Sequence, residues 1–125
     1  MITLKISGNN FELSKKVVDY VNDKIGELDK YLPRGARQAT GRVILSMDPS
    51  GREDNQFVCE THIEVPGSLL QSKEATINIY AAIDIVEAKL RAQIVKYKDK
   101  HSPKANRRKV WLNKLLGDAS STEEA

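Results

Sequence analysis

The sequence is poor in several features that would point to particular functions. A single cysteine, Cys59, among 125 residues excludes an intramolecular disulfide and, without other soft ligands, a cysteine-based zinc site. No apolar run approaches the roughly 18 residues that a membrane-spanning helix needs. The first residues alternate like a strand and do not read as a signal peptide. We therefore expect a soluble, cytoplasmic protein without a membrane partner.

The residue types that perform catalysis do not form a pattern. The two histidines, His62 and His101, are expected on a strand and at a helix end, with no spacing that suggests a shared metal. Carboxylates are scattered among basic residues, and no glycine-rich phosphate loop is present. An enzyme needs converging acids, bases or nucleophiles. We therefore expect no catalytic site, no metal, no cofactor and no small-molecule substrate.

Positive charge, in contrast, is concentrated in one quarter of the chain. Residues 1–77 carry ten basic and eleven acidic side chains, a net charge of −1. Residues 78–109 carry nine basic and three acidic side chains, a net charge of +6, and residues 110–125 have a net charge of −2. Such a concentration is typical of a surface that binds a polyanion. A solvated, lysine-rich helix is the alternative interpretation.

Hydrophobic periodicity predicts an α+β fold in the order β-α-β-β-β-α, a sandwich of a four-stranded sheet with two helices packed on one face. The predicted elements are a strand at 2–7, a helix from Ser14 to Pro33, strands at 42–47, 57–65 and 69–75, and a long helix from Asn78. The strand at 69–75 has the poorest alternation. The long helix has a continuous apolar stripe formed by Ile79, Ile83, Val86, Leu90, Ile94 and Tyr97.

The basic side chains of the long helix lie on both flanks of this stripe. At 100° per residue, Lys89, Lys96 and Lys100 share one flank, whereas Arg91 and Lys98 lie on the other, where nearby acidic residues partly neutralise them. Lysine and arginine contacts to phosphates give affinity with little sequence readout. Folded RNA is the natural ligand, because no helix-turn-helix or other element that reads a DNA groove is visible.

The residues after the long helix form a different region. We divide the chain into a domain at 1–102 and a partly disordered extension at 103–125. The extension begins with a basic run that contains Lys104, Arg107, Arg108 and Lys109. A short apolar cluster around Trp111 follows, and then an acidic tail. The cluster either packs on the domain or docks a partner, and the basic run is expected to extend an RNA-binding surface.

Three segments resemble the family of ribosome hibernation promoting factors, which includes ribosome-associated inhibitor A and proteins named sigma-54 modulation proteins. These segments are residues 6–13, Lys24 together with 28–31, and 79–100, which begins Ile-Tyr-Ala-Ala-Ile-Asp. The resemblance is to a short form of the family, without a second domain. It implies a factor that binds the small ribosomal subunit, at the 16S rRNA near the A and P sites. There the factor fills the decoding cleft for tRNA and mRNA, and it inhibits translation in stationary phase or stress by steric occlusion.

The resemblance and the charge pattern together give a set of candidate RNA-binding residues. These are Lys24, Lys89, Arg91, Lys96, Lys98, Lys100, Lys104, Arg107, Arg108 and Lys109. Three positions depart from the family pattern. Asn78 stands where the family commonly has Asp, and both residues cap helices well. Arg91 stands one residue before the usual arginine, which turns its guanidinium by about 100° around the helix. Glu74 replaces a residue that is usually small and puts the register of its strand in question.

Two other functions fit the same pattern. A generic binder of double-stranded RNA also combines three strands with a basic helix. A protein-interaction adaptor that modulates a stress regulator is the second alternative. We expect the free protein to be a monomer that acts on the small subunit and on intact ribosomes. Whether it pairs ribosomes or keeps them apart stays open.

Overall fold

The structure, a computed structural model, describes residues 1–100 apart from the side chain of residue 100. Its elements are β1 (Thr3–Asn9), α1 (Lys15–Lys24), the 3-10 helices η1 (Gly26–Tyr31) and η2 (Arg34–Ala36), β2 (Thr40–Met47), β3 (Phe57–Val65), β4 (Ser68–Thr76) and α2 (Ile79–Lys100). This order confirms the predicted α+β fold. The chain divides into two compact units, Met1–Ile94 and Val95–Ala125, and α2 runs from the first into the second.

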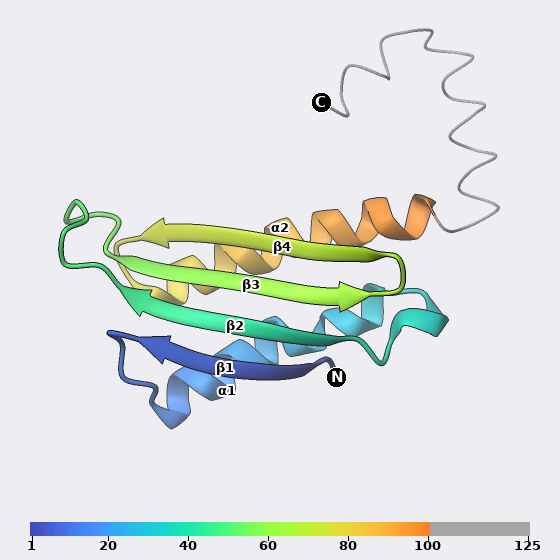
Figure 1. The fold of residues 1–125 in the computed structure, drawn as a ribbon, viewed down its shortest axis with the longest axis horizontal. Helices are drawn as coiled ribbons and strands as arrows, with labels where there is room; N and C mark the ends of the chain where they lie inside the picture. The colour runs from blue at the N-terminus through green and yellow to red at the C-terminus, as the bar shows by residue number, and fades with distance from the viewer. Residues whose placement is uncertain (101–125) are drawn as a thin grey trace, which may run out of the picture. The chain divides into compact units, whose positions relative to one another are not determined.

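The four strands form one mixed sheet in the order β1-β2-β3-β4. β1 pairs with β2 in parallel, whereas β2 with β3 and β3 with β4 are antiparallel. The uncertain strand at 69–75 is therefore real, and Glu74 pairs in register with Cys59. Gly67, with a φ of 76°, makes the turn between β3 and β4 possible, because this left-handed conformation is unfavourable for other residues. Within Met1–Ile94, α1 and α2 lie behind the sheet in the view of Figure 1.

The core of the first unit lies between the helices and one face of the sheet. Alternate strand residues point inward, among them Val43, Leu45, Cys59 and Ile63, which are fully buried. The helices contribute the buried residues Val17, Val21, Ile25, Leu28, Ile83, Val86, Leu90 and Ile94. Tyr97, in the second unit, is buried as well. The predicted apolar stripe of α2 is thus confirmed along its whole length.

The first helix differs from the prediction, which extended it to Pro33. The α-helix ends at Lys24 with Ile25 as its C-cap, and a separate 3-10 helix begins at Gly26. The carbonyl of Gly26 accepts a hydrogen bond from the N–H of Ile2 at 2.8 Å. An N–H from another segment thus takes the place of the N–H four residues ahead that would continue the α-helix. The start, in contrast, is as predicted, because Ser14 Oγ accepts the N–H of Val17 at 3.2 Å.

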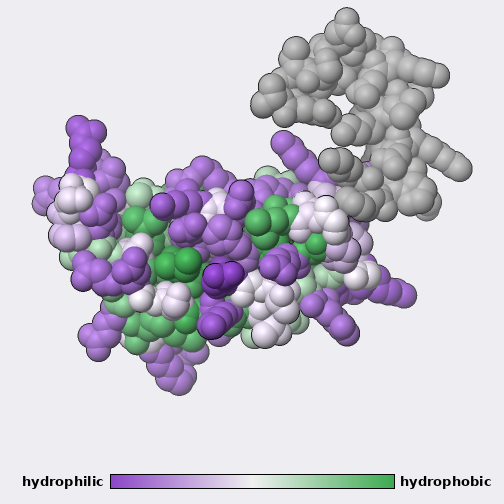
Figure 2. Space-filling model, viewed as in Figure 1, coloured by the Kyte–Doolittle hydropathy of each residue, from purple (hydrophilic) through white to green (hydrophobic). Residues whose placement is uncertain are grey.

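The opposite face of the sheet is open. One row across it consists of Lys5, Arg42, His62 and Gln71, each on a different strand. Figure 2, in the same view, shows hydrophilic and hydrophobic side chains interspersed on this side. None of the outward-facing strand residues is Phe, Tyr or Trp. The open face therefore lacks the stacking platform of an RNA-recognition sheet, and its mostly polar character agrees with the predicted alternation.

Candidate nucleic-acid interface

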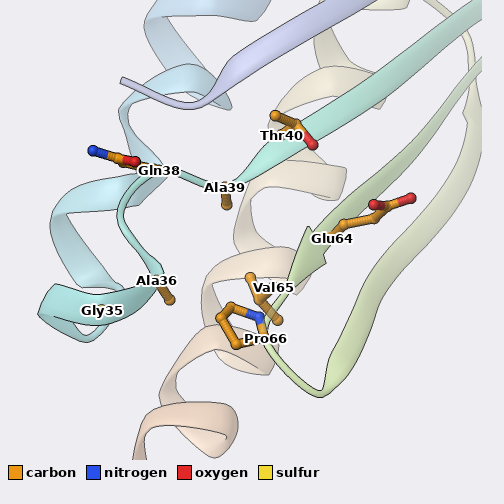
Figure 3. A pocket seen from close by; sticks show the side chains of 8 residues that line it. All are labelled: Gly35, Ala36, Gln38, Ala39, Thr40, Glu64, Val65 and Pro66. Atoms are coloured by element: carbon orange, nitrogen blue, oxygen red, sulfur yellow. The ribbon is translucent and has the colours of Figure 1, made fainter.

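One hollow in the first unit is lined largely by small and apolar residues. This hollow of about 290 Å³ lies between the η2–β2 connection and the β3–β4 turn. It is lined by Ala36, Ala39, Val65 and Pro66, whereas Gln38 and Glu64 point away from one another in Figure 3. Within residues 1–100 there is no group of three or more His, Cys, Asp or Glu that could hold a metal ion. No described helix is long and apolar enough to cross a membrane.

Aromatic and cationic side chains gather instead on the surface of α1 and α2. Tyr20 on α1 and Tyr80 on α2 form an edge-to-face pair, with ring centroids 5.0 Å apart and ring planes at 90°. The ammonium of Lys24 lies 5.7 Å from the Tyr20 centroid, and that of Lys16 lies 5.9 Å from the Tyr80 centroid. Both rings are half-buried. We call Lys16, Tyr20, Lys24, Tyr80 and Asp84 the tyrosine cluster.

Asp84 fixes the tyrosine cluster in place. The Tyr20 hydroxyl donates a hydrogen bond to Asp84 Oδ1 at 2.5 Å, and Lys24 Nζ lies 3.8 Å from the same oxygen. The hydrogen bond to the carboxylate, with burial and the carboxylate charge as smaller causes, raises the pKa of Tyr20 from 10.0 to about 12. The Tyr20 hydroxyl therefore keeps its proton, and with it the hydrogen bond to Asp84, to a higher pH than the hydroxyl of a free tyrosine. Lys24, a predicted RNA-binding residue, is partly neutralised by an adjacent carboxylate.

Arg91 is paired more tightly. Its Nε and Nη2 donate to both carboxylate oxygens of Glu87, at 3.0 and 2.6 Å, one helical turn away. The hydrogen bonds and the charge of Glu87 raise the pKa of Arg91. The guanidinium also lies 5.7 Å from the ring centroid of Tyr31, on η1. The predicted neutralisation on this flank is confirmed for Arg91, which faces the Glu87 carboxylate and the Tyr31 ring. It is wrong for Lys98, which makes no ion pair with another described residue.

Lys89 lies on the other flank and also has a partner. Its Nζ donates to Glu74 Oε1, which β4 presents at the edge of the sheet. The next turn of α2 contacts the same strand, because the amide of Gln93 accepts from the N–H of Gln71 at 3.0 Å and donates to its C=O at 2.7 Å. Lys89 and Gln93 thus both tie α2 to β4. Glu74, the departure from the family pattern, is the residue that neutralises Lys89.

The lysine side chains that the structure describes in the second unit have no carboxylate partner of this kind. Lys96 and Lys98 are exposed on the last turns of α2 and make no ion pair with another described residue. Lys100 is the last residue of α2. The remaining candidates, Lys104, Arg107, Arg108 and Lys109, and the Trp111 segment lie outside the described residues.

The sequence interpretation missed the tyrosine cluster. Tyr80 belongs to the segment that resembles the family but not to the apolar stripe, and its ring is only half-buried and packs on Tyr20. Lys16 was not among the candidates. A signal was present, because residues 16, 20 and 24 alternate basic, aromatic and basic at a spacing of four, which places them on one helical face.

These observations define a small α+β domain whose helices carry charged and aromatic surface residues. The chain belongs to the family described as "Sigma 54 modulation protein / S30EA ribosomal protein", whose sequence pattern matches residues 4–102.

Two similar proteins are both named ribosome hibernation promotion factor. The one from Lactococcus lactis is 34% identical over 118 residues, which cover 94% of this chain and 60% of that protein. The one from Picosynechococcus is 31% identical over 98 residues, or 78% of this chain and 50% of that protein. The chain therefore spans only 50–60% of the length of these relatives.

Solved structures show the same fold. The N-terminal domain of Protein Y from Thermus thermophilus superposes with a TM-score of 0.66 at 29% identity, over 78% of this chain and 99% of that one. A ribosomal subunit interface protein from Coxiella burnetii superposes with a TM-score of 0.62 at 18% identity, over 78% of this chain and 98% of that one. At that identity the second likeness concerns the fold alone.

Proposed function

We propose that this protein is a ribosome hibernation factor that acts by binding, without catalysis, in the cytoplasm. It binds the small ribosomal subunit in the decoding cleft, at the 16S rRNA near the A and P sites, and inhibits translation by occupying the space of tRNA and mRNA. Family membership supports the proposal, as do the names of the two relatives from Lactococcus and Picosynechococcus.

The distribution of unpaired positive charge is the observation that carries the RNA-binding part of the proposal. Residues 1–94 hold 12 basic and 13 acidic side chains, a net charge of −1, whereas residues 95–109 hold seven basic and one acidic, a net charge of +6. Lys24, Lys89 and Arg91, in the first unit, each lie beside a carboxylate. Lys96 and Lys98 are therefore the described candidates most available to phosphates, and the four cations at 104–109 add to them.

The mechanism follows from shape and charge. The sheet and the buried faces of its helices form a rigid body that can fill a cleft, because its core is closely packed. Lysines that contact phosphates release counterions, so binding is strong at low salt and has little sequence preference. An occupied decoding cleft cannot accept tRNA or mRNA, and the ribosome stays intact but inactive.

Sedimentation of the full chain with purified ribosomes on sucrose gradients tests the proposal. We expect the protein to migrate with small subunits and intact ribosomes at low salt and to be released at high salt. Adding tRNA and mRNA beforehand should reduce binding, because they occupy the same cleft. Protein that stays at the top of the gradient at both salt concentrations would contradict the proposal.

The same samples separate the two alternative functions. A generic binder of double-stranded RNA would bind any long duplex as tightly as it binds the small subunit. An adaptor would keep its partner after substitution of Lys96 and Lys98, since its binding would not depend on phosphates. A ribosome-binding factor should instead lose affinity and salt dependence together.

A further inference from the structure

The tyrosine cluster has features that the binding of phosphates does not require. Its two rings come from residues 60 positions apart, on α1 and α2, and both are half-buried. Apolar or charged side chains would join two helices equally well. Tyrosine adds a flat π surface with a polar group at its edge, a combination that is common where proteins contact ligands.

The ring of Tyr20 is held before any ligand arrives. Its hydroxyl donates to Asp84 at 2.5 Å, and its position is fixed further by the edge-to-face contact with Tyr80, at a centroid distance of 5.0 Å. A ligand that stacks on an ordered ring avoids the entropy cost of ordering it.

A movable cation lies near each ring. Lys24 and Lys16 place their ammonium groups 5.7 and 5.9 Å from the centroids of Tyr20 and Tyr80. At an exposed position such a contact is weak, and the lysine stem is flexible. The ion pair of Lys24 with Asp84, at 3.8 Å, is exposed and therefore weak as well. Each ammonium can leave its ring for a phosphate of the nucleotide whose base is stacked. The cluster thus offers both contacts that a single nucleotide needs.

We infer that the tyrosine cluster is a stacking site for an unpaired RNA base, which lies on the face of one tyrosine ring while the other ring supports that ring edge to face, with Lys16 and Lys24 binding the adjoining phosphates. The ligand is single-stranded, because bases in a duplex are already covered by their neighbours, whereas unpaired bases stack on aromatic side chains. This inference rests on the proposed binding to ribosomal RNA and adds a base contact to it.

The test compares two RNAs that differ only in their bases. Full-length protein is titrated into a labelled single-stranded RNA of about ten nucleotides, and into the same backbone with its central bases replaced by abasic sites. Phosphate contacts are equal in both, so a difference in Kd measures stacking. We expect the abasic RNA to bind about fivefold or more weakly. Equal Kd values for the wild-type protein would overturn the inference, and this comparison needs no variant.

Two variants locate the effect. Tyr20→Leu combined with Tyr80→Leu should make the two RNAs bind alike, whereas Tyr31→Leu, which removes a surface tyrosine outside the cluster, should leave the difference unchanged. Circular dichroism checks that each variant is folded. Binding of a duplex of the same sequence should be equal for the wild type and the double variant. A base-dependent difference that survives in the double variant, or an equal loss of duplex binding, would overturn the inference. Ribosome sedimentation of the wild type reports separately on the proposed function.

Discussion

The helix α2 contains two groups of basic residues, of which one is paired with carboxylates of the described residues and the other is not. In the first unit, Lys89 is paired with Glu74 and Arg91 with Glu87. In the second unit, Lys96 and Lys98 are exposed without an ion pair to a described residue. Residues of one charge on one helix are therefore not equivalent. The first group is already paired with carboxylates of the domain, and the second is available for an external polyanion.

The largest expected effect concerns the buried face of α2, on which the stability of the domain depends. Leu90 is fully buried in the apolar stripe of α2. Leu90→Ala should lower the free energy of unfolding by about 2–5 kcal/mol, because it removes buried methyl groups and leaves a cavity. Urea denaturation measures the change. A loss below about 1 kcal/mol would show that the core does not depend on this contact, and only a folded variant can be used for binding experiments.

Neutralising the lysines of the second unit that lie on α2 tests the part of the account that concerns RNA binding. Lys96, Lys98 and Lys100 changed together to Gln should weaken ribosome binding roughly 100-fold near physiological salt, if each contacts one phosphate. The plot of log Kd against log salt should also become shallower by about 2–3. The matched control changes Lys5, Arg42 and Lys73 to Gln on the open sheet face, which removes the same charge. Equal losses for both variants would mean that only total charge matters.

Removing the carboxylate that pairs with Lys89 should strengthen binding, whereas the previous variant should weaken it. Glu74→Gln leaves Lys89 free to reach a phosphate, so affinity for the small subunit should rise, by about fivefold at most, since an exposed ion pair is weak. The plot of log Kd against log salt should become steeper by about one, because one more phosphate is contacted. Glu64→Gln, the same substitution on the open face, serves as the control. Weaker binding by Glu74→Gln would indicate that Glu74 positions Lys89 for RNA.

The smallest expected effect concerns Tyr20, whose pKa is raised from 10.0 to about 12 in the folded state. Between these pH values the unfolded chain has lost the tyrosine proton and the folded chain still holds it. The hydrogen bond therefore stabilises the fold fully below pH 10, and this stabilisation is lost as pH rises toward 12. Tyr20→Phe should show a flatter decline in stability over this range. Denaturation curves at about pH 8 and pH 11 measure it, and identical declines would refute the assignment.

Most of the fold could be predicted from the sequence, because helices and strands have different hydrophobic periods. The sequence predicts the long helix, its buried stripe and its start at Asn78. In the structure Asn78 caps the helix, because its Oδ1 accepts the N–H of Ala81 at 2.8 Å. The end of α1 at Lys24 was not predicted. Just beyond it, the Gly26 carbonyl accepts the N–H of Ile2, a long-range contact that the helical pattern does not show. Local periodicity does not report a partner 24 residues away in the chain.

The candidate site was less predictable for the same reason. The pairing of Lys89 with Glu74 depends on the register of β4, the strand with the poorest alternation. The contact between Tyr20 and Tyr80 depends on how α1 and α2 pack. The neutralisation of Arg91 by Glu87 could be predicted, because both residues lie on one helix, four positions apart. Charge counts along the chain give the location of basic residues but not which of them are already paired.

The most direct test of the account measures ribosome affinity over a range of salt concentrations for three proteins. These are the wild type, the Lys96/Lys98/Lys100→Gln variant and the Lys5/Arg42/Lys73→Gln control, all at full length. We predict that the wild type and the control share a steep salt dependence and that the helix variant has a weaker affinity and a shallower slope. A helix variant with the affinity and slope of the wild type would contradict the account.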